Sequence, residues 1–270
     1  MPELPEVETI RRSLLPHLVG ARVTAVTVRE RRLRRPVAPD FAAQLRGRHL
    51  VSLERRGKYL LVGLDDGRVL LVHLGMSGSL ELAPQARARA VHDHVVIAFD
   101  RDLKLVFNDP RRFGLMRIGH VEELAELRQV GRDPLTAAPT PAEWRAIVRG
   151  RRLPIKNLLI DQRVIAGIGN IYANEMLFHA GIRPRRRADS LRRADLERLG
   201  AAMQRVLVEA TDLGGSSISD YRDANGRRGF FQMRHAVYDR AGEPCRACGT
   251  AIKRTVLSGR SSFYCPRCQC

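Results

Sequence analysis

Apolar residues recur at helical spacing near the start of the chain. Between residues 5 and 18 this spacing places five apolar residues on one face: Val7, Ile10, Leu14, Leu15 and Leu18. Pro5 suits the first turn of a helix, and Gly20 suits the position just after its end. The pattern therefore predicts an amphipathic helix over residues 5–18.

From residue 21 to residue 118 the apolar residues alternate in short runs, many of them β-branched. Turn signals separate the runs, such as Asp-Asp-Gly at 65–67 and Asp-Arg-Asp at 100–102. The predicted strands are 22–28, 49–53, 59–64, 68–74, 79–82, 94–99, 104–107 and 114–118. Many short strands at this spacing are typical of an antiparallel β-sandwich or barrel.

Near residue 120 the helical spacing returns, and residues 121–129 are predicted to be helical. The further helices predicted are 142–148, 155–160, 170–180 and 194–211, with a long loop rich in glycine and serine at 213–232. The expected fold is α+β with two domains. The expected boundaries are 1–130 for the N-terminal helix and β-sandwich, 131–236 for the helical part and 237–270 for a separate terminal part.

The composition is that of a globular protein, with 44% hydrophobic residues, but the net charge is +18. Such a charge favours a polyanionic partner, above all a nucleic acid. No stretch is long and apolar enough for a membrane span, and the acidic N-terminus has no signal-peptide pattern, so a cytoplasmic protein is expected. Only four of the 47 basic residues are lysines, which unlike arginine can exchange protons: Lys58, Lys104, Lys156 and Lys253.

All five cysteines lie in the last 26 residues. Four of them form a CxxC pair, a sixteen-residue spacer and a second CxxC pair: Cys245, Cys248, Cys265 and Cys268. This spacing predicts one structural Zn²⁺ held by four thiolates, with Cys270 left over. The stretch between the pairs is typical of a β-hairpin with Arg260 at its turn. Arg260 is either a phosphate contact or a solvated turn residue.

The first residues carry a candidate reaction centre. Removal of Met1 would leave Pro2 with a free secondary amine, followed at once by Glu3. A secondary amine that attacks an aldehyde-level carbon gives a charged iminium, which is an electron sink for elimination. The simpler interpretation is an ordinary helix start, with acidic residues placed favourably at its positive end.

Three further stretches suit nucleic acid, each with a structural alternative. The glycine-rich turn 167–170 before a predicted helix offers N–H groups to a phosphate and fits a helix-two-turn-helix. Loops 75–78 and 109–114 carry Met76, Arg111 and Phe113, which could fill a gap in a duplex or belong to a core and its surface. Lys58 before a strand is by default a surface lysine, and His92 is expected to donate to a phosphate or to a nearby carboxylate.

Taken together and in this order, the motifs resemble bacterial formamidopyrimidine-DNA glycosylase, an enzyme family that removes oxidised purines such as 8-oxoguanine and then cleaves the abasic site. The resemblance covers essentially the whole chain. It rests on Pro2–Thr9, Gly57–Leu60, His73–Gly78, His92–His94, Asp109–Gly114, Gly167–Tyr172 and the four-cysteine finger.

The resemblance implies a role for each motif. Pro2 is the Schiff-base nucleophile on C1′ of the sugar, and Glu3 is the acid that protonates the opening deoxyribose ring. Lys58 assists β-elimination, and Arg260 contacts phosphate and assists δ-elimination. Met76, Arg111 and Phe113 fill the gap in the duplex. The implied contacts to DNA or to the lesion are His92, Arg111, Arg151, Lys156 and Asn170.

The resemblance also implies that the 214–232 loop closes over the flipped base and that Glu6 helps to position the nucleophile or the base. The expected partner is double-stranded DNA with oxidised bases or abasic sites, bound by a monomer, and Zn²⁺ is the expected metal. Two alternatives stay open at this point. One is an oxidised-pyrimidine glycosylase of the endonuclease VIII branch, and the other is a non-catalytic zinc-containing DNA-binding protein.

Overall fold

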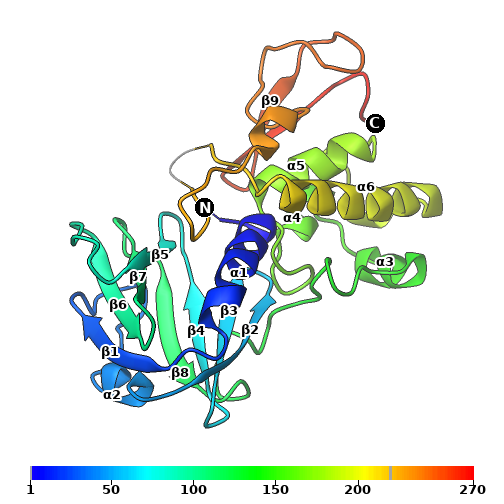
Figure 1. Cartoon of the computed structure of the whole chain (residues 1–270). Helices are drawn as coiled ribbons and strands as arrows, with labels where there is room; N and C mark the ends of the chain where they lie inside the picture. The colour runs from blue at the N-terminus through cyan, green and yellow to red at the C-terminus, as the bar shows by residue number, and fades with distance from the viewer. Residues whose placement is uncertain (1, 219–220) are drawn as a thin grey trace. The chain divides into compact units, whose positions relative to one another are not determined.

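The computed structural model describes residues 2–218 and 221–270, which form two compact units (Figure 1). The first unit runs to Arg128 and includes Gly214–Phe230, and the second comprises Gln129–Leu213 and Phe231–Cys270. The 214–230 segment, which the sequence analysis placed with the helices, thus belongs to the N-terminal unit. The terminal hairpin belongs to the same unit as the helices. Met1, removed in the proposed mature protein, and Ser219 and Asp220 of the predicted loop lie outside the described residues.

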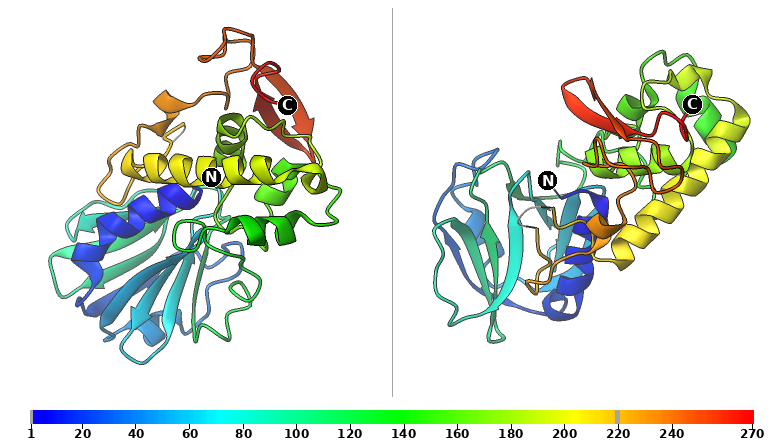
Figure 2. Two further views of the ribbon diagram at one scale, coloured as in Figure 1. Left: turned by 90° about the vertical axis from the view of Figure 1, so that its right-hand side faces the viewer. Right: turned by 90° about the horizontal axis from the view of Figure 1, so that it is seen from above.

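The first unit consists of helix α1 (Leu4–Leu18) and two four-stranded antiparallel sheets (Figure 2). The first sheet has the order β1 (Val23–Val28), β6 (Asp93–Phe99), β7 (Leu103–Asn108) and β5 (Ser79–Pro84). The second has the order β2 (Leu50–Arg56), β3 (Tyr59–Leu64), β4 (Val69–His73) and β8 (Leu115–Gly119). All eight predicted strands are present, and the antiparallel sandwich is confirmed.

The core of this unit lies between the two sheets. Alternate residues of each strand point inward, so that Phe99 and Phe107 of the first sheet join Val62 and Leu70 of the second in one buried cluster. The apolar face of α1 joins the same cluster through Leu14 and its neighbours. Each large side chain buried in this way stabilises the fold by about 1.5–3 kcal/mol. Packing on the sandwich therefore fixes the position of α1 and of the residues that precede it.

One local prediction for this unit was wrong, and one short element was missed. Residues 121–129 form consecutive turns, with Leu124 N–H bonded to Val121 O and Leu127 N–H bonded to Leu124 O, instead of a helix. Leu124 and Leu127 are buried, and the Glu126 carboxylate pairs with arginines of two other segments, so tertiary contacts override the local helical preference. A one-turn helix that the sequence analysis missed, α2 (Phe41–Leu45), is too short to show a helical period.

The second unit combines helices with a terminal hairpin. Its elements are α3 (Pro141–Val148), α4 (Ile155–Leu159), α5 (Asn170–His179), the 3₁₀ turns Ala188–Ser190 and Phe231–Arg234, α6 (Arg193–Asp212), β9 (Lys253–Leu257) and β10 (Arg260–Tyr264). The predicted helices and hairpin are thereby confirmed. A chain of ring contacts links α5 to β10 through Tyr172, Phe231, His235, Tyr238 and Phe263. None of the helices in the described residues is long and apolar enough to cross a membrane.

Candidate functional site

The start of α1 fixes Pro2 and Glu3 in place. Both residues are buried, and Glu3 is the residue that caps the helix. The Glu3 N–H donates to Glu6 Oε2 at 2.8 Å, and the Val7 N–H donates to Glu3 O at 3.1 Å. The first bond satisfies a backbone N–H that the helix end leaves open, and the second is the first hydrogen bond within the helix. The amine of Pro2 is therefore attached to a held backbone, beside a carboxylate.

A second network joins α1 to the turn that carries Lys58. The Glu8 carboxylate accepts from Arg11 at 2.8 Å and from Arg55 of β2 at 3.0 Å, and Arg55 Nη1 also donates to Gly57 O at 3.1 Å. Burial alone would raise the pKa of Glu8, but the hydrogen bonds from Arg11 and Arg55 outweigh it and lower the pKa to about 2. Glu8 is thus ionised at neutral pH. It ties the helix that follows Pro2 and Glu3 to the end of the strand next to Lys58.

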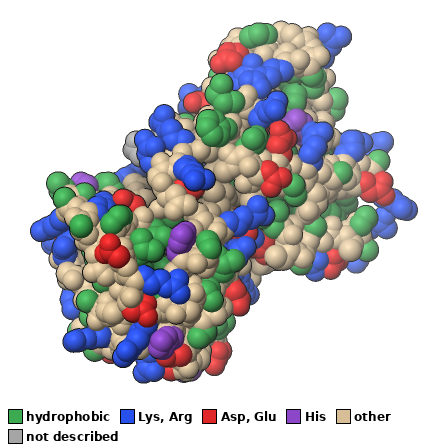
Figure 3. Space-filling model, in the orientation of Figure 1, with side chains coloured by type: hydrophobic (Ala, Val, Ile, Leu, Met, Phe, Trp, Pro, Cys, Tyr) green, Lys and Arg blue, Asp and Glu red, His purple; other side chains and the backbone are tan. Residues whose placement is uncertain are grey.

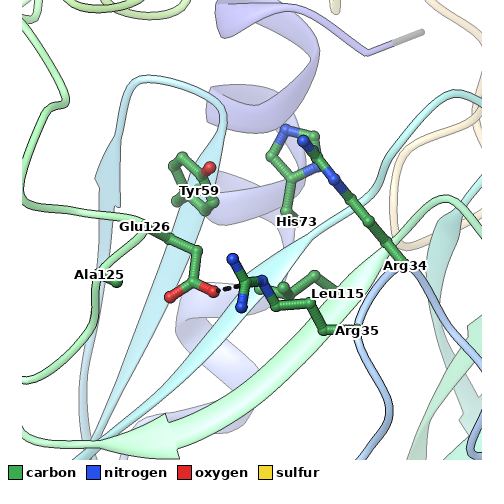
Figure 4. Close-up of a pocket in the computed structure, with 7 residues that line it drawn as sticks. All are labelled: Arg34, Arg35, Tyr59, His73, Leu115, Ala125 and Glu126. Carbon is green, nitrogen blue, oxygen red and sulfur yellow. Dashed lines mark ion pairs between the residues drawn. The ribbon is translucent and has the colours of Figure 1, made fainter.

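Near Lys58, a pocket of about 480 Å³ opens on the outer face of the second sheet. It is lined by Arg34, Arg35, Tyr59, His73, Leu115, Ala125 and Glu126 (Figure 4). Tyr59 and His73 are a cross-strand pair of β3 and β4, so their side chains share this face. Arg35 is turned away from His73 and pairs with Glu126 at 3.2 Å, whereas the Arg34 guanidinium lies beside the His73 ring.

His73 is held as a neutral hydrogen-bond donor. Its Nδ1 accepts the Gly75 N–H at 2.9 Å, so the proton of the neutral ring is carried by Nε2. Burial lowers the pKa of His73 to about 4, and the charges of Lys58 and Arg34 act in the same direction. The sequence analysis gave His73 no role, although it opens one of the motifs. The sequence could have indicated a role for His73, because a histidine at a strand end next to a glycine-rich loop is well placed to bind a ligand.

The two loops that carry Met76 and Phe113 are held together by Asp109, which is fully buried. Its carboxylate accepts from Ser77 Oγ at 2.7 Å and from the Gly114 N–H at 2.8 Å. The backbone of Gly75, at φ +66°, approaches so closely that a Cβ there would lie 2.4 Å from the carbonyl carbon of Phe113. The loops thus form one assembly within the first unit.

From this assembly three side chains project into solvent. Met76 and Phe113 are each 45% exposed, and Arg111 is exposed as well. The Arg111 guanidinium lies over the Phe113 ring, 4.9 Å from its centroid. The structure therefore brings together the three residues expected to fill a gap in DNA. The expected core alternative does not hold for Met76 and Phe113.

His92 directly precedes β6 and is exposed. His94 is buried, and its Nε2 lies 2.7 Å from Asp109 O. The hydrogen bonds of Asp93 go to Arg87 and Asn108. Among the described residues the groups able to hold a metal are the four cysteines, so the pair of histidines is not part of a metal cluster. His92 faces solvent with its ring available to a ligand.

In the second unit, the turn before α5 is shaped by a side chain that the sequence analysis did not single out. Gln162 accepts the Gly167 N–H at 2.9 Å and donates to Ile168 O at 2.7 Å. Gly167 has φ +86°, a conformation that favours glycine. Asn170 begins α5, and its buried Oδ1 has no hydrogen-bond partner in the described part of the chain. The helix N-terminus and this amide form the predicted polar site.

Lys156 does not occupy the position expected of a DNA contact. It is only 1% exposed, and its ammonium donates to Ser261 O at 2.7 Å and to Ser262 Oγ at 2.6 Å. The physical reason is that a buried ammonium needs acceptors, and β10 supplies them. Lys156 therefore ties α4 to the strand that begins with Arg260. Arg260 itself is exposed next to Gly259, which adopts φ +74° in the hairpin turn.

Arg151 lies in the segment between α3 and α4 and is exposed. Its backbone is fixed, since its N–H donates to Val148 O at 3.1 Å and its carbonyl accepts the Asp189 N–H at 3.0 Å. The neighbouring Arg152 is exposed too. The described contacts thus leave the guanidinium of Arg151 on the surface of the second unit, as a phosphate contact requires.

The four cysteines of the CxxC pairs converge as a metal site. All four Sγ atoms lie within 4.8 Å of one another, and two of the separations are 3.9 Å and 3.5 Å. Four sulfurs around a tetrahedral zinc at about 2.3 Å would be roughly 3.8 Å apart. The residues therefore fit one structural Zn²⁺. Cys270 is exposed at the end of the chain.

Comparison with known proteins identifies the family. The chain is 45% identical over 271 residues to formamidopyrimidine-DNA glycosylase of Methylococcus capsulatus, and the match covers all of both chains. The chain belongs to the formamidopyrimidine-DNA glycosylase family. Its family models match in order: the N-terminal domain at 1–116, the H2TH domain at 130–222 and the zinc finger found in FPG and IleRS at 242–269.

Solved structures of the family agree with this. Fpg (MutM) of Thermus thermophilus is 42% identical, covers 99% of this chain and 98% of its own, and superposes with a TM-score of 0.88. Fpg of Lactococcus lactis in complex with DNA that contains an abasic site is 33% identical, with 99% coverage of both chains and a TM-score of 0.91. The resemblance seen in the motifs is confirmed. The protein is a DNA glycosylase of base excision repair with AP lyase activity, and the two alternatives left open by the sequence are not favoured.

Proposed function

We propose that this glycosylase removes oxidised purines from double-stranded DNA through a Schiff base formed by the amine of Pro2. The observation that carries the proposal is the buried pair of Pro2 and Glu3 at the start of α1, joined through Glu6 and Glu8 to the turn of Lys58. The relatives support the substrate class, because a mutant Lactococcus lactis Fpg was solved with a Fapy-dG containing DNA.

The proposed reaction begins with attack of the Pro2 nitrogen on C1′, while the C1′–N bond to the damaged base breaks. Glu3 protonates the ring oxygen, so the sugar opens and leaves an iminium. The iminium acidifies the C2′ proton, whose removal expels the 3′-phosphate with help from Lys58. A second elimination, assisted by Arg260, expels the 5′-phosphate. Water then releases the sugar fragment, which leaves a one-nucleotide gap with a phosphate at both ends.

The other proposed contacts follow from the exposed side chains. Met76, Arg111 and Phe113 enter the space left by the extruded nucleotide, because an apolar wedge unstacks the step and a guanidinium answers the orphaned base. His92, Arg151 and the start of α5 at Asn170 bind phosphates. For Lys156 we replace the expected DNA contact with a positioning role, in which its ammonium holds β10 and hence Arg260.

Borohydride trapping tests the nucleophile. The purified protein is expected to form a covalent adduct with abasic DNA that survives denaturing electrophoresis. The Pro2→Gly variant and a variant with an N-terminal extension should form the adduct at least tenfold more slowly, since the secondary amine is lost or blocked. Trapping and base excision at full rate with the amine blocked would refute the role of Pro2.

The lesion range needs its own experiment. Excision of 8-oxoguanine opposite cytosine is expected to be faster than excision of thymine glycol under single-turnover conditions. The reverse order would favour the oxidised-pyrimidine specificity of the endonuclease VIII branch. A cut at 8-oxoguanine that leaves phosphates at both ends of the gap would support the β,δ-elimination sequence.

We also propose that the enzyme acts as a monomer in the cytoplasm. A reducing compartment keeps the four cysteines available as thiolates for zinc. Light scattering at the concentrations used for activity would show a mass of one 30.4 kDa chain.

A further inference from the structure

The 214–230 segment is bound to the same side chain that holds the first residues of the chain. Glu6 is 2% exposed, and its two carboxylate oxygens point to different partners. Oε2 accepts the Glu3 N–H at 2.8 Å, and Oε1 accepts the Ser216 N–H at 2.7 Å. One carboxylate therefore connects the residue next to Pro2 with a segment more than two hundred residues later.

Other contacts enforce this connection. The Tyr221 hydroxyl donates to the backbone carbonyl of Glu6 at 3.1 Å. Gly215, at φ +81°, brings its backbone so close that a Cβ there would lie 2.7 Å from Glu6 Oε1. Only glycine can take this conformation and this approach without displacing the carboxylate. The position of the segment thus determines where the Glu6 carboxylate lies.

The rest of the segment is also tied down. Ser217 Oγ donates to Tyr221 O at 2.9 Å and accepts the Gly229 N–H at 2.9 Å, so it closes the two arms of the segment on each other. The Ala224 N–H approaches Ser13 Oγ of α1 at 3.4 Å, and its carbonyl accepts the Leu82 N–H at 2.9 Å. Along its described residues the segment is built onto α1 and the sandwich. A change in its conformation is therefore transmitted to α1.

We propose that Glu6 is a positioning residue that couples the 214–230 segment to the amine of Pro2. This inference rests on the proposed role of Pro2. The Ser216 N–H holds Glu6 Oε1 while Oε2 accepts the Glu3 N–H, so the segment helps to set the position of the carboxylate that orients Glu3 and hence Pro2. The segment thereby controls the attack on C1′ directly, in addition to any contact that it makes with a base. Pro2 is placed for attack while Gly215 and Ser216 keep this arrangement against Glu6.

The test uses DNA that contains an abasic site, because it has no base for the segment to recognise. Gly215→Ala pushes a methyl group into the Glu6 carboxylate. Gly47→Ala is the matched control: Gly47 has φ +83°, but a Cβ there would meet nothing closer than 4.0 Å, and it lies outside the proposed site. The single-turnover rate of borohydride trapping is measured for both variants.

Gly215→Ala is expected to slow trapping by roughly ten- to a hundredfold, the size that a displaced reacting group produces. Gly47→Ala should stay within about twofold of the wild type, since it carries the same backbone strain without the collision. If Gly215→Ala is trapped as fast as Gly47→Ala and only its excision of 8-oxoguanine is slower, the coupling is overturned. The segment would then have a role in base recognition only.

A double-mutant cycle separates coupling from an independent effect of Glu6. Glu6→Gln keeps the shape but puts an N–H₂ group where one of the two N–H donors must bind, so it should slow trapping by itself. Added to Gly215→Ala it should slow trapping little further, because both changes break the same connection. Effects that multiply would contradict the proposal. If thermal unfolding shows that Gly215→Ala does not fold, Tyr221→Phe takes its place in the cycle with the same criteria.

The outcome for Pro2 stays separate. A wild type that is not trapped, or Pro2→Gly trapped as fast as the wild type, would refute the proposed nucleophile. If trapping depends on Pro2 but Gly215→Ala does not slow it, and the effects of the two changes in the cycle are independent, the coupling alone is refuted.

Discussion

Several buried charged side chains of this protein bind backbone groups instead of opposite charges. The Glu175 carboxylate accepts the N–H groups of Ala236, Val237 and Tyr238 at 2.7, 3.0 and 2.8 Å. Burial raises the pKa of Glu175, and the three N–H donors oppose that rise. Lys156 holds β10 in the same manner. A buried charge satisfied in this way fixes the position of a chain segment, because the segment cannot move without leaving the charge unsolvated.

Lys156→Met should therefore affect the hairpin more than its lost charge suggests. It leaves the Ser261 carbonyl and the Ser262 hydroxyl without their donor, which costs about 1–3 kcal/mol of unfolding free energy. We expect cleavage of abasic DNA to stop more often after β-elimination, because Arg260 is less well held, and gel analysis of the DNA ends measures this ratio. Lys104→Met is the control, since Lys104 binds two backbone carbonyls in the other unit. Equal product ratios in both variants would refute the positioning role of Lys156.

Histidines give the stability of the protein a pH dependence. Burial, as the first cause, lowers the pKa of His73, His179 and His235 to about 4 each, from an ordinary value of 6.5. Between pH 6.5 and pH 4 the unfolded chain binds these protons and the folded chain does not, so the free energy of unfolding falls as the pH falls. Chemical denaturation at pH 7, 6 and 5 should show this loss. His73→Asn should show a shallower decline than the wild type, and an equal slope would contradict the assignment for His73.

At the scale of elements, the β9–β10 hairpin has anchors beyond the thiolates. The Asn174 amide of α5 accepts the Phe263 N–H at 2.8 Å, and Gln269 links the Cys265 N–H to Ile182 O with two bonds of 2.8 Å. Together with Lys156, these side chains attach the strand of Arg260 to the helices. The hairpin is thus part of the helical unit. Lys156 and Asn174 hold it through β10, and Gln269 holds the neighbouring Cys265.

Removal of zinc should consequently loosen the cysteine loops before the rest. With a chelator, amide hydrogen exchange is expected to speed up at residues 245–250 and 265–270, where the metal would otherwise clamp the chain. Exchange in β10 should rise less, and exchange in the sandwich should not change. Loss of protection throughout the first unit on chelation would contradict the division into two units.

The elements that the sequence predicted well have a strong period of their own. The helix at 5–18 buries residues at helical spacing, and residues 95–99 alternate between buried and half-buried positions. The strand at 59–64 is a short, nearly continuous apolar run that is buried on both faces. Residues 121–129 were misjudged because Leu124 and Leu127 are as compatible with turns as with a helix. The roles of Asp109, Glu175 and Lys156 could not be predicted, since each depends on a hydrogen-bond partner that is distant in sequence.

At the scale of the whole molecule, the positive charge is widely spread. On the face drawn in Figure 3, lysine and arginine side chains occur over both units, with acidic side chains among them. Several arginines are neutralised in pairs, as Arg55 is by Glu8 and Arg186 by Asp195. The net charge of +18 nevertheless leaves a large excess to attract DNA.

Binding to DNA should therefore weaken steeply with salt. The logarithm of the association constant is expected to fall linearly with the logarithm of salt concentration, by nearly one unit of slope for each phosphate contacted. Arg151→Ala should reduce that slope by about one, because its guanidinium is proposed to bind a phosphate. Fluorescence anisotropy with an undamaged duplex measures both slopes. An unchanged slope in Arg151→Ala would exclude that contact. Arg193→Ala, which removes a partner of Glu197, serves as the control.

The shared anchor at Asp109 has a consequence for how the protein searches DNA. Because one buried carboxylate holds Ser77 and Gly114, the side chains of Met76, Arg111 and Phe113 are presented by a single rigid assembly. The conformational entropy of ordering the two loops is lost when the protein folds, and not at each encounter with a base pair. The proposed insertion into the duplex would then be one movement of the whole assembly, and withdrawal would reverse it.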